Sequence, residues 1–430
     1  MLLNIEVFLF LIVSRILSFL SKLFKKGSGT SVPGYLVEYY FPFLVKFFDK
    51  KYKQVIYITG TNGKTTTRAI LVDLFEKNKI SVASNRGGAN IFRGVASALF
   101  QDLGFNLKVK SDVLILEVEE ATLPKIKDYI TVDALILTNI FRDQLDAYGE
   151  IDTTLNYFKD FLSVQNCEVV INGDDPKLLE IVPSLNNKIT YCGIISDEMP
   201  KYEGSIKLNV DYNYQATNIN YRSGLMEFDM NGQFYTTQLS GVYNIYNIIF
   251  AVVIANKNKL KFVPQYLSTF KPVFGRGERF VINKVTTSLY LVKNPEGFNQ
   301  VLQFVKKAYV GEKVNLIFLV NDNIADSRDV SWLWDVEFEK FRAEFLVNQV
   351  DINNIFVGGS RADDILLRLE YADFHSISYG NNLGSIATVI DNLQSLESTN
   401  IVFATYTAML EFRKELSRYI EVSSITNVGN

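Results

Sequence analysis

Residues 54–67 read QVIYITGTNGKTTT, an apolar run that leads directly into a loop ending in Gly-Lys-Thr. The run 54–59 predicts a buried strand, and the residues that follow Lys64 predict a helix. A loop between such a strand and helix can turn its N–H groups toward one anion. The sequence therefore predicts a nucleotide site at the carboxyl end of this strand, formed by Gly60, Thr61, Asn62, Gly63, Lys64, Thr65 and Thr66.

The side chains of this loop have distinct expected roles. Lys64 supplies a positive charge for the outer phosphates of a nucleotide, and the hydroxyl of Thr65 can bind Mg²⁺. The helix that begins here directs its positive N-terminal end toward the same phosphates. A purely structural turn would explain this combination of residues less well.

Acidic residues follow the other apolar runs of this region. The run 113–120 predicts a strand with Glu117 near its carboxyl end, where a second acidic group could bind the Mg²⁺. Judged alone, a solvated carboxylate at a strand end is an equally good interpretation. The runs 134–138 and 167–171 also end in polar loops. Short strands alternating with helical stretches predict an α/β fold with a parallel sheet.

The composition excludes several classes of protein. At 430 residues, with 48% hydrophobic and 21% charged residues, the chain has the composition of a folded protein of two or three domains. A net charge of −3 gives no general attraction to nucleic acid, so we expect no nucleic-acid partner. The single histidine, His375, rules out a multi-histidine metal site, and Cys167 and Cys192 belong to no CxxC pair. We assign His375 no role.

The amino terminus carries an apolar segment, residues 7–13, that Arg15 interrupts. Its charge-free part is shorter than the roughly 20 residues of a spanning helix. If the helix continues beyond this segment, one polar stripe runs along it at helical spacing, formed by Ser14, Ser18, Lys22 and Lys25. We expect a helix packed on its own protein. A helix resting at a membrane interface is the alternative.

Several motifs in this order resemble the Mur ligase family, whose members use ATP to join an amine to a carboxylate of a peptidoglycan precursor. They are residues 59–67, Thr138-Asn139 with Asp143 and Asp146, Asn172 with 174–176, and 241–247. The resemblance implies an N-terminal helical segment (1–50) and a Mur-ligase-type P-loop ATPase central domain (51–275) with an inserted small antiparallel sheet. A Rossmann-like C-terminal domain (276–430) would follow. Gln144 departs from the histidine usual in the family, and we expect a segment of about fifty residues in place of the family's large amino-terminal UDP-binding domain.

The chain looks most like the MurT branch of this family, through residues 293–299, 321–332 and 360–369. That resemblance implies amidation of the D-glutamate α-carboxylate of lipid II to D-isoglutamine through an acyl phosphate. It also implies a heterodimer with a GatD-like glutaminase that delivers the ammonia. ATP and Mg²⁺ would be bound through Lys64, Thr65 and Glu117, with Asn247 on the adenine. Asp329 would complete the partner's Cys-His pair.

Other features of the family are expected to be absent here, or have two possible interpretations. Many members carry a four-cysteine zinc ribbon, which we expect to be absent here, and Ser327 stands where glycine is usual. A carbamylated lysine serves some Mur ligases, but we expect Lys159 to be an ordinary solvated lysine. Arg276 could reach a phosphate or simply be solvated. Without the family resemblance, Asp329 would be a helix cap near Trp332.

From the function that this resemblance implies we expect a cytoplasmic protein, and a peripheral position at the inner face of the plasma membrane is left open. Two alternatives remain open. One is a Mur-type ligase that adds an amino acid, as folylpolyglutamate synthase does, and the other is an ATP-binding scaffold without catalysis. The presence of Lys64, Thr65 and Glu117 together argues against the scaffold.

Overall fold

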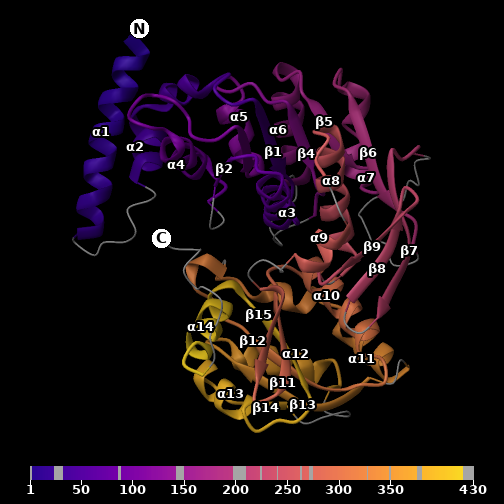
Figure 1. The fold of residues 1–430 in the computed structure, drawn as a ribbon. Helices are drawn as coiled ribbons and strands as arrows, with labels where there is room; N and C mark the ends of the chain where they lie inside the picture. The colour runs from indigo at the N-terminus through magenta and orange to yellow at the C-terminus, as the bar shows by residue number, and fades with distance from the viewer. Residues whose placement is uncertain are drawn as a thin grey trace.

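The computed structural model describes residues 2–23, 32–85, 89–141, 150–196, 210–222, 225–239, 241–261, 264–270, 275–326, 328–347, 350–374 and 380–419. Two sheets, each covered by helices on both faces, form the upper and lower parts of the molecule in Figure 1.

The first part begins with helices and then builds a nine-stranded sheet in the order β2-β3-β1-β4-β5-β6-β7-β8-β9. Its helices are α1 (Leu2–Leu23), α2 (Val32–Tyr40), η1 (Pro42–Phe48), α3 (Lys64–Lys77), α4 (Phe92–Asp102), η2 (Glu120–Thr122), α5 (Leu123–Ile126), α6 (Glu150–Val164), α7 (Pro176–Leu179), η3 (Val182–Ser184), α8 (Tyr243–Lys257) and α9 (Pro264–Thr269). Its strands are β1 (Gln54–Thr59), β2 (Val82–Ser84), β3 (Val113–Glu117), β4 (Ala134–Leu137), β5 (Glu168–Asn172), β6 (Ile189–Ile194), β7 (Tyr214–Arg222), β8 (Leu225–Met230) and β9 (Gln233–Thr237).

The central strands are buried on both faces, which explains their continuous apolar sequence. Side chains alternate between faces along each strand. In β1, Val55 and Tyr57 therefore enter the core shared with α4 and α6, whereas Ile56 and Ile58 enter the core shared with α3 and α8. The predicted strands β1, β3, β4 and β5 are confirmed, to within three residues at their ends.

The expected antiparallel strands are present at the end of this sheet. β7 pairs with β8, and β8 with β9, in antiparallel register. They are not a separate sheet, because β7 also pairs in parallel with β6, from Cys192–Tyr214 to Ile194–Ala216. The antiparallel strands thus extend the central sheet as one hydrogen-bonded layer.

The second part is a six-stranded sheet in the order β10-β11-β15-β12-β13-β14, parallel except for the edge pair β10 and β11. This is the expected Rossmann-like arrangement. Its elements are β10 (Arg276–Ile282), β11 (Val285–Leu291), α10 (Pro295–Ala308), β12 (Lys313–Leu319), η4 (Ile324–Asp326), η5 (Ser331–Asp335), α11 (Phe338–Val347), β13 (Asp351–Gly358), α12 (Ala362–Tyr371), β14 (Gly380–Asn382), α13 (Ile386–Leu393), β15 (Thr399–Ala404) and α14 (Tyr406–Leu416).

One side chain joins the two parts of the molecule. Tyr221 of β7 packs against the cores of both sheets, and its ring lies 5.6 Å from the ring of Phe304 in α10. The far end of the extended first sheet therefore rests on a helix of the second sheet.

The amino-terminal helix α1 runs without interruption through Arg15 and lies along the outer side of the first sheet, with α2 and α4 beside it (Figure 1). One face packs on the protein as expected, through Val7, Phe10, Leu11 and Ser14. Ser14 is buried and its hydroxyl donates to the carbonyl of Leu11, so this residue of the predicted polar stripe lies on the packed face and not at the solvent. The opposite face is apolar and exposed.

Candidate functional site

The predicted nucleotide loop lies between β1 and α3, at the strand where the chain order of the sheet reverses. This is where doubly wound sheets bind ligands. Two glycines allow the turn. Gly60 has φ +119° and Gly63 φ +91°, a region that favours glycine. A Cβ on Gly60 would lie 2.3 Å from Oγ1 of Thr138, and one on Gly63 would lie 2.3 Å from Oδ1 of Asn247. At positions 60 and 63 the loop is therefore packed too closely for a residue larger than glycine.

Asn139, after the neighbouring strand β4, holds the first half of the loop. The N–H of Thr61 donates to the Asn139 carbonyl at 2.9 Å, and the N–H of Asn62 donates to its Oδ1 at 2.9 Å. The Asn139 amide returns a bond to the Asn62 carbonyl at 3.1 Å. These two N–H groups are committed to the protein. The donors available to phosphates are therefore the first N–H groups of α3, which have no partner within the helix.

Lys64 begins α3, and its side chain turns back over the loop. Its ammonium contacts the carbonyl of Gly60 and lies 3.4 Å from both the Thr61 carbonyl and Oε1 of Glu120. The side chain is only 11% exposed. A cation held over a ring of helix N–H groups fits a phosphate chain at this position.

Thr65 and Glu117 meet on the other side of the loop. The hydroxyl of Thr65 donates to Oε1 of Glu117 at 3.0 Å. Two adjacent ligands of an octahedral Mg²⁺, each about 2.1 Å from the metal, lie about 3 Å apart. The spacing of these two oxygens therefore fits a pair of residues that would hold one Mg²⁺.

Glu117 is positioned by two residues that the motifs did not reveal. Asn85, after β2, accepts from the Glu117 N–H at 3.0 Å and donates to its carbonyl at 2.7 Å. Arg68, one turn along α3 from Lys64, lies 3.6 Å from the second carboxylate oxygen. These contacts fix the backbone and the charge of Glu117. β3 ends at Glu117, so the acidic residues that follow it do not belong to the strand.

Asn247 of α8 lies beneath the loop. Its carboxamide oxygen accepts from the hydroxyl of Thr67 at 3.1 Å, and its amide donates to Asn244 at 2.8 Å. The side chain is buried. In this arrangement Asn247 supports the turn at Gly63. The expected adenine contact of Asn247 stays a prediction. Thr66 is fully buried in the same turn.

The acidic pair after β5 has a structural role. Asp175 accepts from the N–H groups of Lys177 and Leu178 at the start of α7 and from that of Ile140 at 2.7 Å. Burial raises the pKa of Asp175 to about 6. Asp174 accepts from the hydroxyls of Tyr212 and Tyr246, and burial raises its pKa too. Asp175 thus ties the segment after β4 to β5.

Some predicted residues cannot be placed. Asp143, Gln144, Asp146, Ser327 and His375 lie outside the described residues. Arg276 begins β10, and only its backbone is described. Lys159 lies on the exposed face of α6, as expected of a solvated lysine.

The second candidate residue, Asp329, lies in the loop between η4 and η5 and is exposed. Its carboxylate accepts from the N–H of Ser331 at 2.8 Å, a bond that lowers the pKa of Asp329. The loop follows β12, at the carboxyl edge of the second sheet. Its start is fixed where Asn321 accepts from the N–H of Ser360 and donates through its own N–H to Thr405.

The end of this loop is fixed by Arg368 of α12, which is buried. Its guanidinium donates to the carbonyls of Leu333 and Val336 at 3.2 and 2.8 Å and to both carboxylate oxygens of Glu339 at 2.7 and 2.9 Å. The guanidinium also lies 5.4 Å from the ring centre of Trp334. Asp329 is therefore presented on a loop anchored at both ends.

No group of three or more His, Cys, Asp or Glu that could hold a metal occurs in the part of the chain that the structure describes. Cys167 and Cys192 are buried free thiols. Burial raises the pKa of Cys167 to about 12 and that of Cys192 further. Neither thiol is poised to act as a thiolate.

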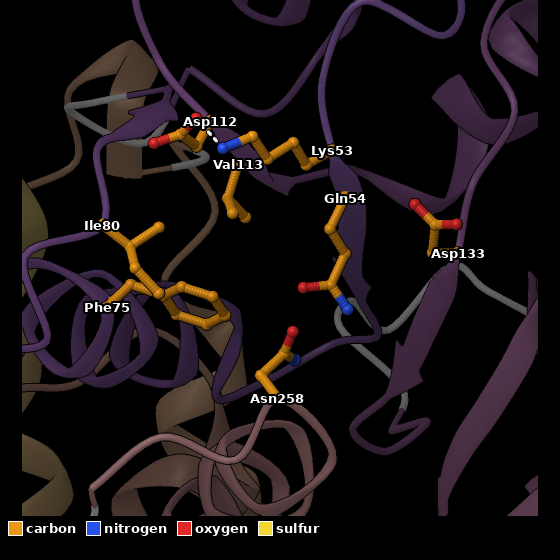
Figure 2. A pocket seen from close by; sticks show the side chains of 8 residues that line it. All are labelled: Lys53, Gln54, Phe75, Ile80, Asp112, Val113, Asp133 and Asn258. Carbon is orange, nitrogen blue, oxygen red and sulfur yellow. Dashed lines mark ion pairs between the residues drawn. The ribbon is translucent and has the colours of Figure 1, made fainter.

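A cavity of about 380 Å³ opens at the amino ends of β1 and β3. Figure 2 shows the amide of Gln54 projecting toward it, and Lys53 reaching Asp112 at 2.8 Å on its rim. This edge of the sheet is opposite the nucleotide loop. The cavity is therefore no part of that site.

Comparison with known families and proteins agrees with this geometry. Residues 58–255 match the family model of the Mur ligase middle domain, and residues 291–409 match that of the MurT ligase C-terminal domain. The nucleotide loop and Glu117 fall in the first match, and Asp329 falls in the second.

Three similar proteins are informative. The MurT subunit of lipid II isoglutaminyl synthase (glutamine-hydrolyzing) from Streptococcus pneumoniae is 32% identical, over 91% of this chain and 93% of that protein. The corresponding Staphylococcus aureus (strain COL) subunit is 27% identical, over 82% and 87%. In fold, the chain resembles MurF ligase from Thermotoga maritima in complex with ADP, with a TM-score of 0.61 and 17% identity over 88% and 83% of the two chains.

Proposed function

The chain belongs to the Mur ligase family, in the branch of the MurT subunits of lipid II isoglutaminyl synthase, and on that premise we propose its chemistry in detail. It is an ATP-dependent carbon–nitrogen ligase of peptidoglycan biosynthesis that amidates lipid II. We assign the acceptor as the D-glutamate α-carboxylate of the stem peptide, which becomes D-isoglutamine. The observation that carries the ATP chemistry is the Thr65–Glu117 pair at 3.0 Å beside the Lys64 ammonium.

The first step activates the carboxylate. A carboxylate is a poor electrophile, so its oxygen attacks the γ-phosphorus of ATP, ADP leaves, and an acyl phosphate forms. The protein's tasks are to hold the phosphates in line and to neutralise their charge. The N-terminal N–H groups of α3 and Lys64 do both. Thr65 and Glu117 would hold Mg²⁺, which supplies charge neutralisation on the phosphates.

The second step needs ammonia. Its nitrogen attacks the carbonyl carbon of the acyl phosphate, phosphate leaves, and the amide forms with loss of a proton. Ammonia at neutral pH is mostly unreactive ammonium, so a source that releases it into a sheltered path is required. A glutaminase cysteine must be activated, whereas both cysteines here are buried with raised pKa values. We therefore assign the ammonia to a GatD-like glutaminase subunit.

The loop that carries Asp329 is the surface we propose for that subunit. Asp329 is exposed on it, and its carboxylate is kept ionised by the Ser331 N–H. Exposed apolar side chains flank it in sequence and on α12, namely Ile324, Trp334, Leu367 and Tyr371. An exposed carboxylate on a loop that also carries exposed apolar side chains fits a protein interface. There Asp329 would orient the partner's catalytic histidine, as the third member of a triad does.

The test uses the purified chain alone, with lipid II, Mg²⁺, ATP and a high concentration of ammonium salt, followed by mass spectrometry of the stem peptide. We expect conversion of one carboxyl to an amide, and loss of that conversion in Lys64→Ala. Lys159→Ala is the matched control, since Lys159 is a solvated lysine on α6.

Failure of this conversion, persisting when a GatD-like glutaminase and glutamine are added, would contradict the proposal. Transfer of an amino acid to the same substrate would instead identify a ligase that takes an amino acid as its amine.

A further inference from the structure

The exposed face of α1 forms a continuous apolar surface. Ile5, Leu9, Val13, Ile16 and Leu20 recur at intervals of three or four residues and are 51, 58, 51, 53 and 37% exposed. That spacing places them on one side of the helix. Val7, Phe10, Leu11 and Ser14 lie on the opposite side and are buried. Among the described helices, α1 alone is long and apolar enough to cross a membrane.

Exposed aromatic side chains also occur on and between α2 and η1, the two elements that pack beside α1. Tyr35, Tyr39, Tyr40, Phe41 and Phe43 are each at least 41% exposed. Phe41 borders α1 directly, because its ring centre lies 5.9 Å from that of Phe10. Aromatic rings with a polar end, such as tyrosine, favour the boundary between water and lipid.

The amino-terminal sequence carries a local excess of positive charge, which suits an anionic bilayer. From residue 7 to residue 37 the sequence contains Arg15, Lys22, Lys25 and Lys26 and no acidic residue, although the whole chain has a net charge of −3. Arg15 is turned to the protein, where it donates to the carbonyl of Leu103 at 3.1 Å and lies 5.8 Å from the ring centre of Phe105. The guanidinium of Arg15 therefore does not lie on the apolar stripe of Ile5, Leu9, Val13, Ile16 and Leu20.

We propose that this surface, α1 with the aromatic residues of α2 and η1, docks on the anionic lipid bilayer. The helix lies in the plane of the membrane, with its apolar stripe among the acyl chains. It does not span the bilayer, because its other face remains packed on the protein core. The proposal rests on the proposed function in that the acceptor, lipid II, is itself held in a bilayer.

The test is flotation of the purified full chain with vesicles, without ATP or lipid II. One set contains equal amounts of phosphatidylglycerol and phosphatidylcholine, and the other contains phosphatidylcholine alone. We expect binding to the mixed vesicles, weaker binding at high salt and weaker binding to phosphatidylcholine. The variant Leu9→Gln with Val13→Gln should partition about tenfold less, because two inserted apolar side chains are lost.

The matched control is Val281→Gln with Val310→Gln, which changes two valines that are 61 and 56% exposed on the second part of the molecule. It should bind vesicles as the unchanged chain does. Circular dichroism melting checks that both variants fold.

Equal vesicle binding by the α1 variant and the unchanged chain would overturn the proposal. So would a dimer in sedimentation that only the α1 variant loses, since a second copy would then cover the surface. Retention on vesicles after an alkaline carbonate wash would show a spanning helix instead. A failed proposed function would appear separately, as absent amidation of detergent-solubilised lipid II while vesicle binding persists.

Discussion

The hydroxyl of Thr65 and the carboxylate of Glu117 are joined by a 3.0 Å hydrogen bond that links the first turn of α3 to the last residue of β3. Neither group is fixed by its own element alone. Asn85 holds the peptide groups on both sides of Glu117, and Arg68 lies against its second oxygen. The two oxygens are therefore held in place without a metal, so the side chains of Thr65 and Glu117 need not rearrange for a metal to bind.

Glu117→Gln is expected to lower ammonium-driven amidation by roughly 10²–10³-fold, the size of effect seen when one group that stabilises transferred charge is removed. The amide keeps the shape but loses the negative charge that binds Mg²⁺. Initial rates at increasing Mg²⁺ concentrations measure this. Glu76→Gln, an exposed position at the far end of α3, should change nothing, and a variant as fast as the control would remove Glu117 from the metal site.

Gly63→Ala should abolish ATP binding, because the new methyl group meets Oδ1 of Asn247 at 2.3 Å and the residue must keep φ +91°. Left-handed strain alone costs about 1 kcal/mol for a non-glycine residue. Gly311→Ala separates the two causes, since Gly311 has φ +73° with nothing within 4 Å of the added atom. Isothermal titration with ATP should show binding in the control and none in Gly63→Ala. Equal affinities would contradict the close packing of the loop.

Asp329→Asn is expected to depress glutamine-driven amidation roughly 10²-fold or more, as loss of the orienting carboxylate does in catalytic triads. Ammonium-driven amidation should stay within about twofold, since Asp329 belongs to the second sheet and not to the nucleotide loop. Asp351→Asn, an exposed carboxylate at the opposite end of the same sheet, is the control. Equal loss of both activities would sink the assigned role.

The buried carboxyl of Asp175 should make stability depend on pH. Its pKa is raised to about 6 from the ordinary 3.8, so between these values the folded chain keeps a proton that the unfolded chain has lost. The contribution of Asp175 is fully present below about pH 4 and is lost as pH rises to about 6, a change of about 3 kcal/mol.

Denaturant unfolding at pH 4, 5, 6 and 7 measures this change as the difference between the unchanged chain and Asp175→Asn, which cannot ionise. The difference should shift in favour of the variant as pH rises. A difference independent of pH would mean that Asp175 titrates normally.

The sequence predicts elements whose signals are local. Strand β1 was expected at 54–59 and is found at Gln54–Thr59, because an apolar run there meets a glycine. Strand β3 was expected to reach residue 120 but ends at Glu117, where Glu120 begins η2. Pairing of β7 with β6 was not predicted, since hydrogen-bond partners far apart in sequence leave no periodic signal.

The same limit applies to the site. The loop residues and Glu117 follow from motifs, and the structure brings Lys64, Thr65 and Glu117 together. Asn85 supports Glu117 from 32 residues away with no motif of its own. Asn139 was part of a quoted motif, but only the fold shows that it occupies the N–H groups of Thr61 and Asn62.

The ring contact between Tyr221 and Phe304 couples the nine-stranded sheet to the second part of the molecule. Tyr221 belongs to a layer of hydrogen-bonded strands that runs unbroken to β1 and hence to the nucleotide loop. A displacement of α10 would either break this ring contact or displace β7 with it. Because β7 is hydrogen-bonded through the intervening strands to β1, such a displacement would be transmitted through the sheet toward the nucleotide loop.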